Sequence, residues 1–202
     1  MESRILKQLE MLDKLGKDMR LAAEEWSSDF QTLISILMSA RTRDEVTIEV
    51  AKKLFLVFPD AKSLSKAKIS EIESIIRPVN FYRNKSKNIV NCSKTLVENY
   101  DSQVPKSIDE LIKLPGVGRK TANVFLTEIG DSAIGVDTHV AHISKKLGWT
   151  ENSDPHKIES DLKNLFPKEY WNKVNSTLVR FGKTYTSRKQ KDELLEKIKG
   201  EF

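Results

Sequence analysis

The stretch LPGVGRKTANVFLTEIGDSAIGVDTHV, residues 114–140, decides the fold of this 202-residue chain. It opens with two glycines, Gly116 and Gly118, directly before a segment of helical character. Apolar residues recur in that segment at the spacing of one buried helix face, at Ala122, Phe125, Leu126 and Ile129. Glycines before such a helix allow positive φ and let the backbone come close to another molecule.

A shorter helix is predicted just before the glycines, over Ile108–Lys113, led in by Pro105 and capped by Ser107. The two helices and the glycine turn between them form a hairpin. The N–H groups of the turn and of the second helix's N-terminus together make a place for an anion, most simply a phosphate.

Two residues in this stretch are capable of chemistry. Lys120 lies in the first turn of the second helix, about 180° from the apolar stripe at ~100° per residue. Asp137 follows seventeen positions later. The helix is about 16 Å long and the seven residues after it reach roughly 24 Å when extended, so Asp137 can lie beside Lys120. Both residues also have structural interpretations, Lys120 as a solvated charge and Asp137 as a helix N-cap.

Composition indicates a globular chain with a sizeable core, of one domain or of two small ones that share a cleft. Hydrophobic residues make up 39% of the sequence and charged residues 31%. No segment has the ~18 consecutive apolar residues of a membrane span, and the first ten residues do not resemble a signal peptide. The single cysteine, Cys92, excludes an internal disulfide and is expected to be a small buried apolar residue.

The positive charge is concentrated in one part of the sequence. Residues 77–120 carry 9 Lys or Arg and 4 Asp or Glu, a net charge of +5 that equals the net charge of the whole chain. A polyanionic partner is the natural inference, and a solvated basic face is the alternative.

Helical periodicity extends over most of the chain, with no strand alternation and no internal repeat, so the predicted fold class is all-α. Asp29 and Asp44 are expected to cap the second and third helices. Beside the hairpin, helices are predicted over Ile5–Met19, Phe30–Ala40, Val46–Phe58, Ser70–Ile76, Arg83–Tyr100, His139–Leu147, Pro155–Phe166, Lys168–Phe181 and Lys189–Lys199.

The run LPGVGRKTANV followed by VDTHV closely resembles the endonuclease III branch of the helix-hairpin-helix DNA glycosylases. The resemblance extends from about Phe30 to Gly182. It implies that Lys120 is the catalytic nucleophile and Asp137 the essential carboxylate. It also implies two helical domains, a six-helix domain over residues 22–133 that ends in the hairpin and a second domain from residues 1–21 and 134–202, with the active site in the cleft between them.

Two loops correspond to those with which this family probes the duplex. In Val79–Arg83, Phe81 occupies the position of the wedge that fills the gap left by an extruded base, next to Asn80. The alternative is that Phe81 belongs to the core of the following helix. Ser39–Asp44 corresponds to the gap-filling loop, where bacterial members carry glutamine and this chain carries Arg41, which can reach a base edge or a phosphate.

Four further residues are assigned to DNA binding or to its support. Gly116, Gly118 and the adjacent Arg119 would meet the DNA backbone at the hairpin. His139, two residues after Asp137, is expected to donate a hydrogen bond to a backbone group or a phosphate rather than to act as a base.

No metal site is expected. The three histidines, at positions 139, 142 and 156, and the lone cysteine do not form a zinc-ligand set. Many relatives hold an iron–sulfur cluster on four C-terminal cysteines, but the corresponding run Gly182–Arg188 has none, so the cluster is expected to be absent. Lys183, Arg188, Lys189 and Lys191 are expected to keep a DNA-facing loop there by charge.

The resemblance thus implies a bifunctional DNA glycosylase and abasic-site lyase for oxidised pyrimidines, acting on double-stranded DNA that carries a damaged base or an abasic site. No cofactor and no membrane association are expected, and the protein is predicted to be a monomer in the cytoplasm, at the nucleoid. Two alternatives remain: a glycosylase for mispaired uracil or thymine, and a non-catalytic helix-hairpin-helix protein that only binds DNA.

Overall fold

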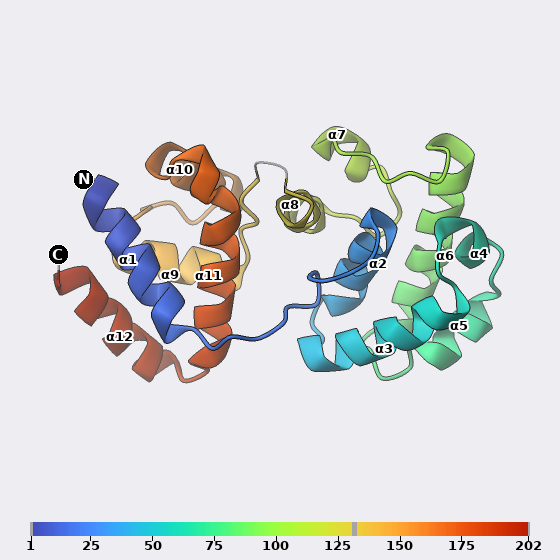
Figure 1. The fold of residues 1–202 in the computed structure, drawn as a ribbon, viewed down its shortest axis with the longest axis horizontal. Coiled ribbons are helices and arrows are strands. Elements are labelled where there is room, and N and C mark those ends of the chain that lie inside the picture. Colours follow the sequence, from blue (N-terminus) through green and yellow to red (C-terminus); the bar gives the residue numbers. More distant parts are fainter. Residues whose placement is uncertain (1, 131–132, 202) are drawn as a thin grey trace. The chain divides into compact units, whose positions relative to one another are not determined.

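The computed structural model describes residues 2–130 and 133–201, which form twelve α-helices, one 3₁₀ helix and no strand (Figure 1). The predicted all-α class is confirmed. The chain divides into two compact units: unit 1 comprises Met1–Met19 and Gly130–Phe202, and unit 2 comprises Arg20–Ile129. None of the described helices is both long and apolar enough to traverse a lipid bilayer.

Unit 2 is organised around α2 (Asp29–Ser39), in which all seven residues from 32 to 38 are buried. A helix that is buried on every side must be surrounded by other elements. Three helices contact α2: α3 (Asp44–Val57), α6 (Tyr82–Asn99) and α8 (Arg119–Glu128) (Figure 1). The two helices that carry the expected DNA-binding residues, α6 and α8, are therefore both anchored on α2.

Three short helices complete unit 2: α4 (Ala61–Ser65), α5 (Ile69–Ile75) and α7 (Ile108–Leu111). This gives seven helices in the unit, one more than the six expected from the resemblance. The additional helix is α4, which packs on α6 and begins with a capping box between Asp60 and Ser63. Five residues are too few for a helical period to be visible in the sequence.

Unit 1 joins the N-terminal helix to the C-terminal part of the chain, since α11 contacts both α1 and α9. Its elements are α1 (Glu2–Leu15), α9 (Thr138–Leu147), α10 (Pro155–Leu165), a 3₁₀ helix (Lys168–Tyr170), α11 (Trp171–Thr184) and α12 (Arg188–Gly200).

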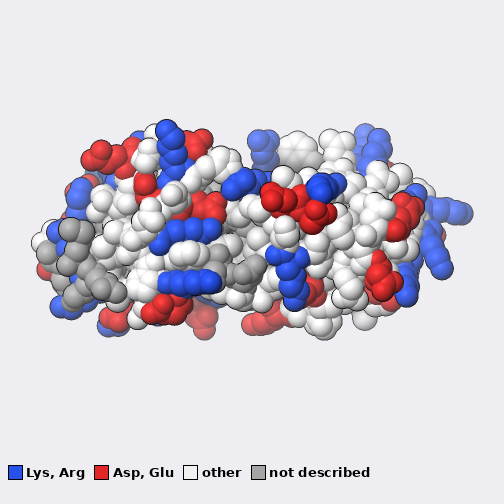
Figure 2. Space-filling model, turned by 90° about the horizontal axis from the view of Figure 1, so that it is seen from above, with Lys and Arg blue, Asp and Glu red and all other residues white. Residues whose placement is uncertain are grey.

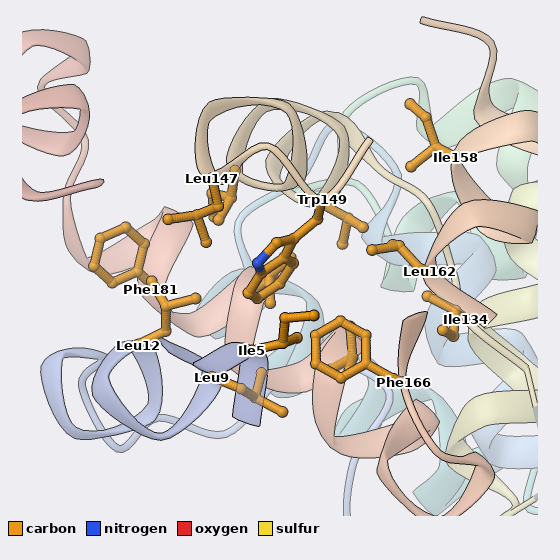
Figure 3. Close-up of a cluster of buried hydrophobic side chains, with 14 of the residues drawn as sticks. Ile5, Leu9, Leu12, Ile134, Leu147, Trp149, Ile158, Leu162, Phe166 and Phe181 are labelled. Carbon is orange, nitrogen blue, oxygen red and sulfur yellow. The ribbon is translucent and has the colours of Figure 1, made fainter. Parts of the chain in front are cut away.

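The core of unit 1 gathers around Trp149, whose ring meets Phe166 edge to face at a centroid distance of 4.9 Å (Figure 3). Ile5 and Leu9 of α1 lie beside it. The indole N–H of Trp149 donates a hydrogen bond of 2.9 Å to the side chain of Gln8, so its polar group is satisfied inside the core. The N-terminal helix is therefore an integral part of this core.

Several predicted helix boundaries were wrong. Ser28, not Asp29, is the N-cap of α2, and its hydroxyl accepts a hydrogen bond of 3.3 Å from the N–H of Gln31. Asp44 is the first residue of α3 rather than its cap. In both cases the aspartate lies in the first turn of the helix. Its negative charge interacts favourably with the helix dipole there, but its side chain is not the N-cap.

The C-terminal part of the chain differs from the prediction in a similar way. The helix predicted over Lys168–Phe181 begins as a 3₁₀ turn and continues as α11 through Gly182 to Thr184. Gly182 lies within α11 and does not end it. Glycine is required here because α9 packs closely against this position: a Cβ at Gly182 would overlap the ring of His139.

Candidate active site and nucleic-acid interface

The hairpin of unit 2 exposes its two glycines to solvent for different reasons. Gly116 has a φ of +82°, and a Cβ there would lie 2.8 Å from the Cβ of Asn88 on α6, so both conformation and packing require glycine. Gly118 is the N-cap of α8, and a Cβ added to it would meet nothing within 4 Å. The space beside Gly118 is therefore open, and neither packing nor a positive φ requires glycine at this position.

Leu114 and Val117 anchor the hairpin, since both are buried and they are linked by a main-chain hydrogen bond of 3.0 Å. The first helix, α7, is shorter than predicted, and residues 112–114 continue it as tight turns. Ser107 stands at its N-cap position, but the serine side chain makes no capping hydrogen bond.

The N-terminus of α8 is open. Its N-cap, Gly118, has no side chain to bind the first N–H groups of the helix, and both Arg119 and Lys120 in the first turn are exposed. Helix N-termini carry unpaired N–H groups and a partial positive charge. This end of unit 2 is suited to bind a phosphate.

Lys120 has no packing role in its unit. The buried face of α8 is formed by Ala122, Phe125 and Leu126, whereas Lys120 is exposed and makes no ion pair with the described residues of unit 2. Its amine is therefore available to an external reactant.

Asp137, in unit 1, is the N-cap of α9, as the structural interpretation of the sequence predicted. One oxygen, Oδ1, accepts hydrogen bonds of 2.8 Å from the N–H groups of His139 and Val140. The other, Oδ2, accepts none from the described residues of its unit. Capping the helix with one oxygen fixes the carboxylate and leaves the second oxygen to act on a ligand.

His139 lies partly buried against Gly182, next to a cavity of about 500 Å³ in unit 1. The described residues that line this cavity include three basic ones, Lys145, Arg188 and Lys191, and no acidic one. Lys191, however, is buried, and its amine donates a hydrogen bond of 2.9 Å to the carbonyl of Gly182. The prediction that Lys191 belongs to a DNA-facing loop was wrong, because this lysine connects α12 to α11. Burial lowers the pKa of Lys191, although Asp192 and Asp137 favour its charged form.

A second polar contact holds α12 on α9. The carboxylate of Asp192 lies 2.7 Å from His142 Nε2 and 3.3 Å from Lys146 Nζ. Burial alone would raise the pKa of Asp192, but the hydrogen bonds from these two residues outweigh it and hold the pKa below its usual value.

The C-terminal segment does not fit an iron–sulfur cluster, which needs thiolate ligands. The residues after α11 begin α12, with Ser187 as its N-cap, and bury Leu195 and Ile198 in the core of unit 1. The only cysteine, Cys92, is buried in unit 2, where burial raises the pKa of its thiol to about 12. Among the residues that the structure describes, no three metal-ligating side chains gather at one place.

Phe81 is 58% exposed, which excludes the alternative that it is a core residue. It stands at the N-cap of α6 with a φ of +60°, a conformation that side-chain-bearing residues rarely adopt. Arg41, exposed in the loop before α3, has a φ of +57°, and its guanidinium lies 5.7 Å from the centre of the Phe81 ring. The structure thus brings these two predicted residues together on one surface of unit 2.

Asn80 and Lys85 connect the two loops. The amide of Asn80 donates a hydrogen bond of 2.5 Å to the carbonyl of Arg41. Lys85, which the sequence analysis did not single out, is buried, and its amine donates to the carbonyls of Met38 and Ala40. A lysine within the apolar stripe of α6, four residues before Ile89, was the signal that could have identified it.

The basic segment predicted from the sequence is available at the surface. Of the nine Lys and Arg residues between 77 and 120, Lys85 is buried and the other eight are exposed. Exposed Lys and Arg side chains alternate with acidic ones on the face shown in Figure 2.

The fold and these residues define a helix-hairpin-helix protein. Residues 34–168 match the HhH-GPD superfamily of base excision DNA repair proteins. The chain is 42% identical to endonuclease III of Thermotoga maritima over 177 residues, which cover 86% of this chain and 83% of the relative. It is 40% identical to endonuclease III of Bacillus subtilis over 184 residues, covering 88% and 84%.

A solved structure shows the same fold. The trapped covalent intermediate of endonuclease III with DNA superposes with a TM-score of 0.83 at 33% identity, covering 93% of this chain and 88% of that one. The chain therefore belongs to the HhH-GPD superfamily and, within it, to the endonuclease III family. The predicted class of enzyme, a DNA glycosylase with abasic-site lyase activity in base excision repair, is confirmed at the level of the family.

Proposed function

We propose that this enzyme removes oxidised pyrimidines from double-stranded DNA and then cleaves the strand at the resulting abasic site, with Lys120 as the nucleophile. The observation that carries the proposal is the position of Lys120: an exposed amine without a packing role, two residues after the open glycine of the hairpin. DNA is the partner that the exposed basic segment and the phosphate-binding end of α8 favour.

In this proposal the hairpin sets the register on the DNA. A phosphate beside the lesion accepts hydrogen bonds from the N–H groups of Gly116, Gly118 and Lys120, and Arg119 adds charge. The lesion base is turned out of the duplex, and Phe81 and Arg41 enter the gap that it leaves. His139, beside the basic cavity of unit 1, supports the backbone on that side.

The chemical step uses Lys120 of unit 2 and Asp137 of unit 1. The free oxygen of Asp137 accepts a proton from Lys120 and stabilises the positive charge that develops on the sugar. The uncharged amine attacks C1′, the bond from C1′ to the base breaks, and the departing base takes up a proton.

Strand cleavage follows from the imine that forms at C1′ when the attached amine loses a proton and the C1′–O4′ bond of the sugar ring breaks, so that O4′ leaves as a hydroxyl group. The imine acidifies the proton on C2′, whose loss is coupled to breakage of the C3′–oxygen bond, so the strand is cut on the 3′ side of the lesion. Water then hydrolyses the imine and regenerates Lys120. No metal or organic cofactor takes part, and a monomer in the cytoplasm, acting on nucleoid DNA, suffices.

A panel of duplexes, each with one damaged or mispaired base, tests this assignment when borohydride is added during turnover. An oxidised pyrimidine and an abasic site should each give strand cleavage and a covalent protein–DNA adduct, because borohydride reduces the imine. Reaction with mispaired uracil or thymine alone would overturn the substrate assignment. Binding without any adduct would overturn the catalytic one.

A further inference from the structure

The two loops that carry Arg41 and Phe81 are joined by polar contacts and form one structural element. The side-chain amide of Asn80 binds the carbonyl of Arg41 at 2.5 Å, and the N–H of Asn80 donates to the hydroxyl of Thr42 at 3.2 Å. The guanidinium of Arg41 lies over the Phe81 ring. Both Arg41 and Phe81 have left-handed backbone conformations, which persist only where the surrounding structure holds them.

Lys85 contacts both sides of this element. Its main-chain N–H donates to the carbonyl of Phe81 at 3.1 Å, one turn before it in α6. Its side-chain amine donates to the carbonyl of Ala40 at 2.6 Å and to the hydroxyl of Thr42 at 3.3 Å. These two residues are the immediate neighbours of Arg41 in the chain.

The same amine also donates to the carbonyl of Met38 at 2.7 Å. Met38 lies in the last turn of α2 and Ala40 is its C-cap, so these carbonyls belong to the group that a helix leaves without internal partners. A buried ammonium at the C-terminus of a helix satisfies them and matches the dipole of that end. This explains why a lysine, 8% exposed, stands in the apolar stripe of α6.

We propose that Lys85 is a positioning residue for the proposed reaction on duplex DNA: it holds Arg41 and Phe81 together in the conformation that enters the gap. The inference rests on the proposed function, since it assigns the two loops their task in the duplex. Lys85 itself does not touch the DNA. Its effect reaches the substrate through the residues on either side of Arg41 and through the first turn of α6.

The test compares one abasic strand in two forms, as a duplex and as a single strand. Only the duplex has a gap to be filled, whereas both forms need the amine of Lys120. Lys85→Met keeps an unbranched side chain, one heavy atom shorter, and removes the three donor hydrogens of the amine. It should lower cleavage of the duplex by about 10-fold or more, as expected for misplaced substrate contacts, and leave cleavage of the single strand within about twofold.

A matched control is Lys53→Met, which removes an exposed lysine of α3, outside the basic segment 77–120, and should leave the ratio of the two rates unchanged. A double variant separates positioning from general support of the fold. If Lys85 acts through Phe81, adding Lys85→Met to Phe81→Ala should cost much less than Lys85→Met does alone. Fully additive effects, or an equal loss on both substrates, would overturn the proposal.

Thr42→Val provides a second variant that leaves Lys85 in place. It removes the hydroxyl that both Lys85 and Asn80 contact, and it should lower the duplex rate selectively, by a smaller factor. This variant decides the question if Lys85→Met does not fold, and an unchanged ratio of rates in a folded Thr42→Val would contradict the inference. Failure of the parent protein to cleave either form would instead refute the proposed function.

Discussion

The first turns of α6 and α8 each carry a lysine in the same unit, but the two amines have opposite environments. Lys85 is buried, and its amine donates to three oxygen atoms, one in the last turn of α2 and two in the connection from α2 to α3. Lys120 is exposed and makes no ion pair within the described residues of its unit. Phe81 stands at the N-cap of α6, whereas Gly118, which has no side chain, stands at the N-cap of α8.

This difference distinguishes a lysine that positions neighbouring loops from a lysine that can react with a substrate. An amine that binds three acceptors at fixed positions orders the loops around it but cannot approach a substrate. An amine that is free at the end of an open helix orders nothing but can attack. The following predictions test this distinction, in order of decreasing effect.

Removal of the free amine should have the largest effect. Lys120→Gln should lower strand cleavage by a factor on the order of 10⁴ or more, as loss of a covalent nucleophile does, while the melting temperature stays near that of the parent. Single-turnover cleavage of an abasic duplex measures it. Lys53→Gln removes an exposed lysine of unit 2 outside the basic segment 77–120 and is the control. A Lys120→Gln enzyme that still cuts would eliminate the contrast between the two lysines.

Loss of the Asp137 carboxylate should have the second-largest effect on cleavage. Asp137→Asn should lower cleavage by roughly 10²–10⁴-fold, the range for a positioned acid–base group. The stability of α9 should change little, because asparagine caps a helix as well as aspartate does.

Asp154 offers a matched control, since it caps α10 through the same pair of main-chain contacts. Asp154→Asn should leave cleavage unchanged. If the two variants behave alike, Asp137 is only an N-cap, and the carboxylate has no part in the reaction.

The burial of Lys85 predicts a dependence of stability on pH. Burial lowers the pKa of Lys85 from 10.5 to about 8. Between these values the unfolded chain binds more protons than the folded one, so the penalty for burying the charge, fully present below pH 8, is relieved as pH rises.

The free energy of unfolding of the parent, relative to that of Lys85→Met, should therefore increase by roughly 2 kcal/mol between pH 7 and pH 9.5. Urea denaturation of both proteins at the two pH values measures the difference, in which the other lysines cancel. A difference that does not change with pH would show that the amine is not desolvated.

The wedge should show the smallest effect. Phe81→Ala should weaken binding to a duplex with a lesion by about 10-fold, the value of one lost stacking contact, and leave binding to a single abasic strand unchanged. Leu56→Ala, which truncates an apolar side chain that is 85% exposed at the far end of α3, should alter neither. A large fall in the melting temperature of Phe81→Ala would show that its ring supports the fold rather than the DNA.

The sequence predicted those features that depend on local spacing. The glycine hairpin, the solvent-facing position of Lys120 on α8 and the capping by Asp137 all follow from residues within a few positions of one another. The apolar periods predicted most helices, but not α4, whose five residues show no period.

Contacts between segments that are distant in the chain could not be predicted from the sequence. Lys85 lies 45 residues from Ala40 and 47 from Met38, and only the packing of α6 on α2 brings its amine to those carbonyls. The expectation for Lys191 failed for the same reason. Its charge indicated a surface role, whereas α12 folds onto the core of unit 1 and carries this lysine to Gly182.

The central claim is that the free lysine of α8 forms the covalent bond to DNA, and the most direct measurement locates that bond. The parent protein, trapped with borohydride on an abasic duplex, is digested with nuclease and protease, and the modified peptide is sequenced by mass spectrometry. The account predicts a reduced sugar remnant on Lys120. A remnant on another lysine, or on the N-terminal amine, would contradict it.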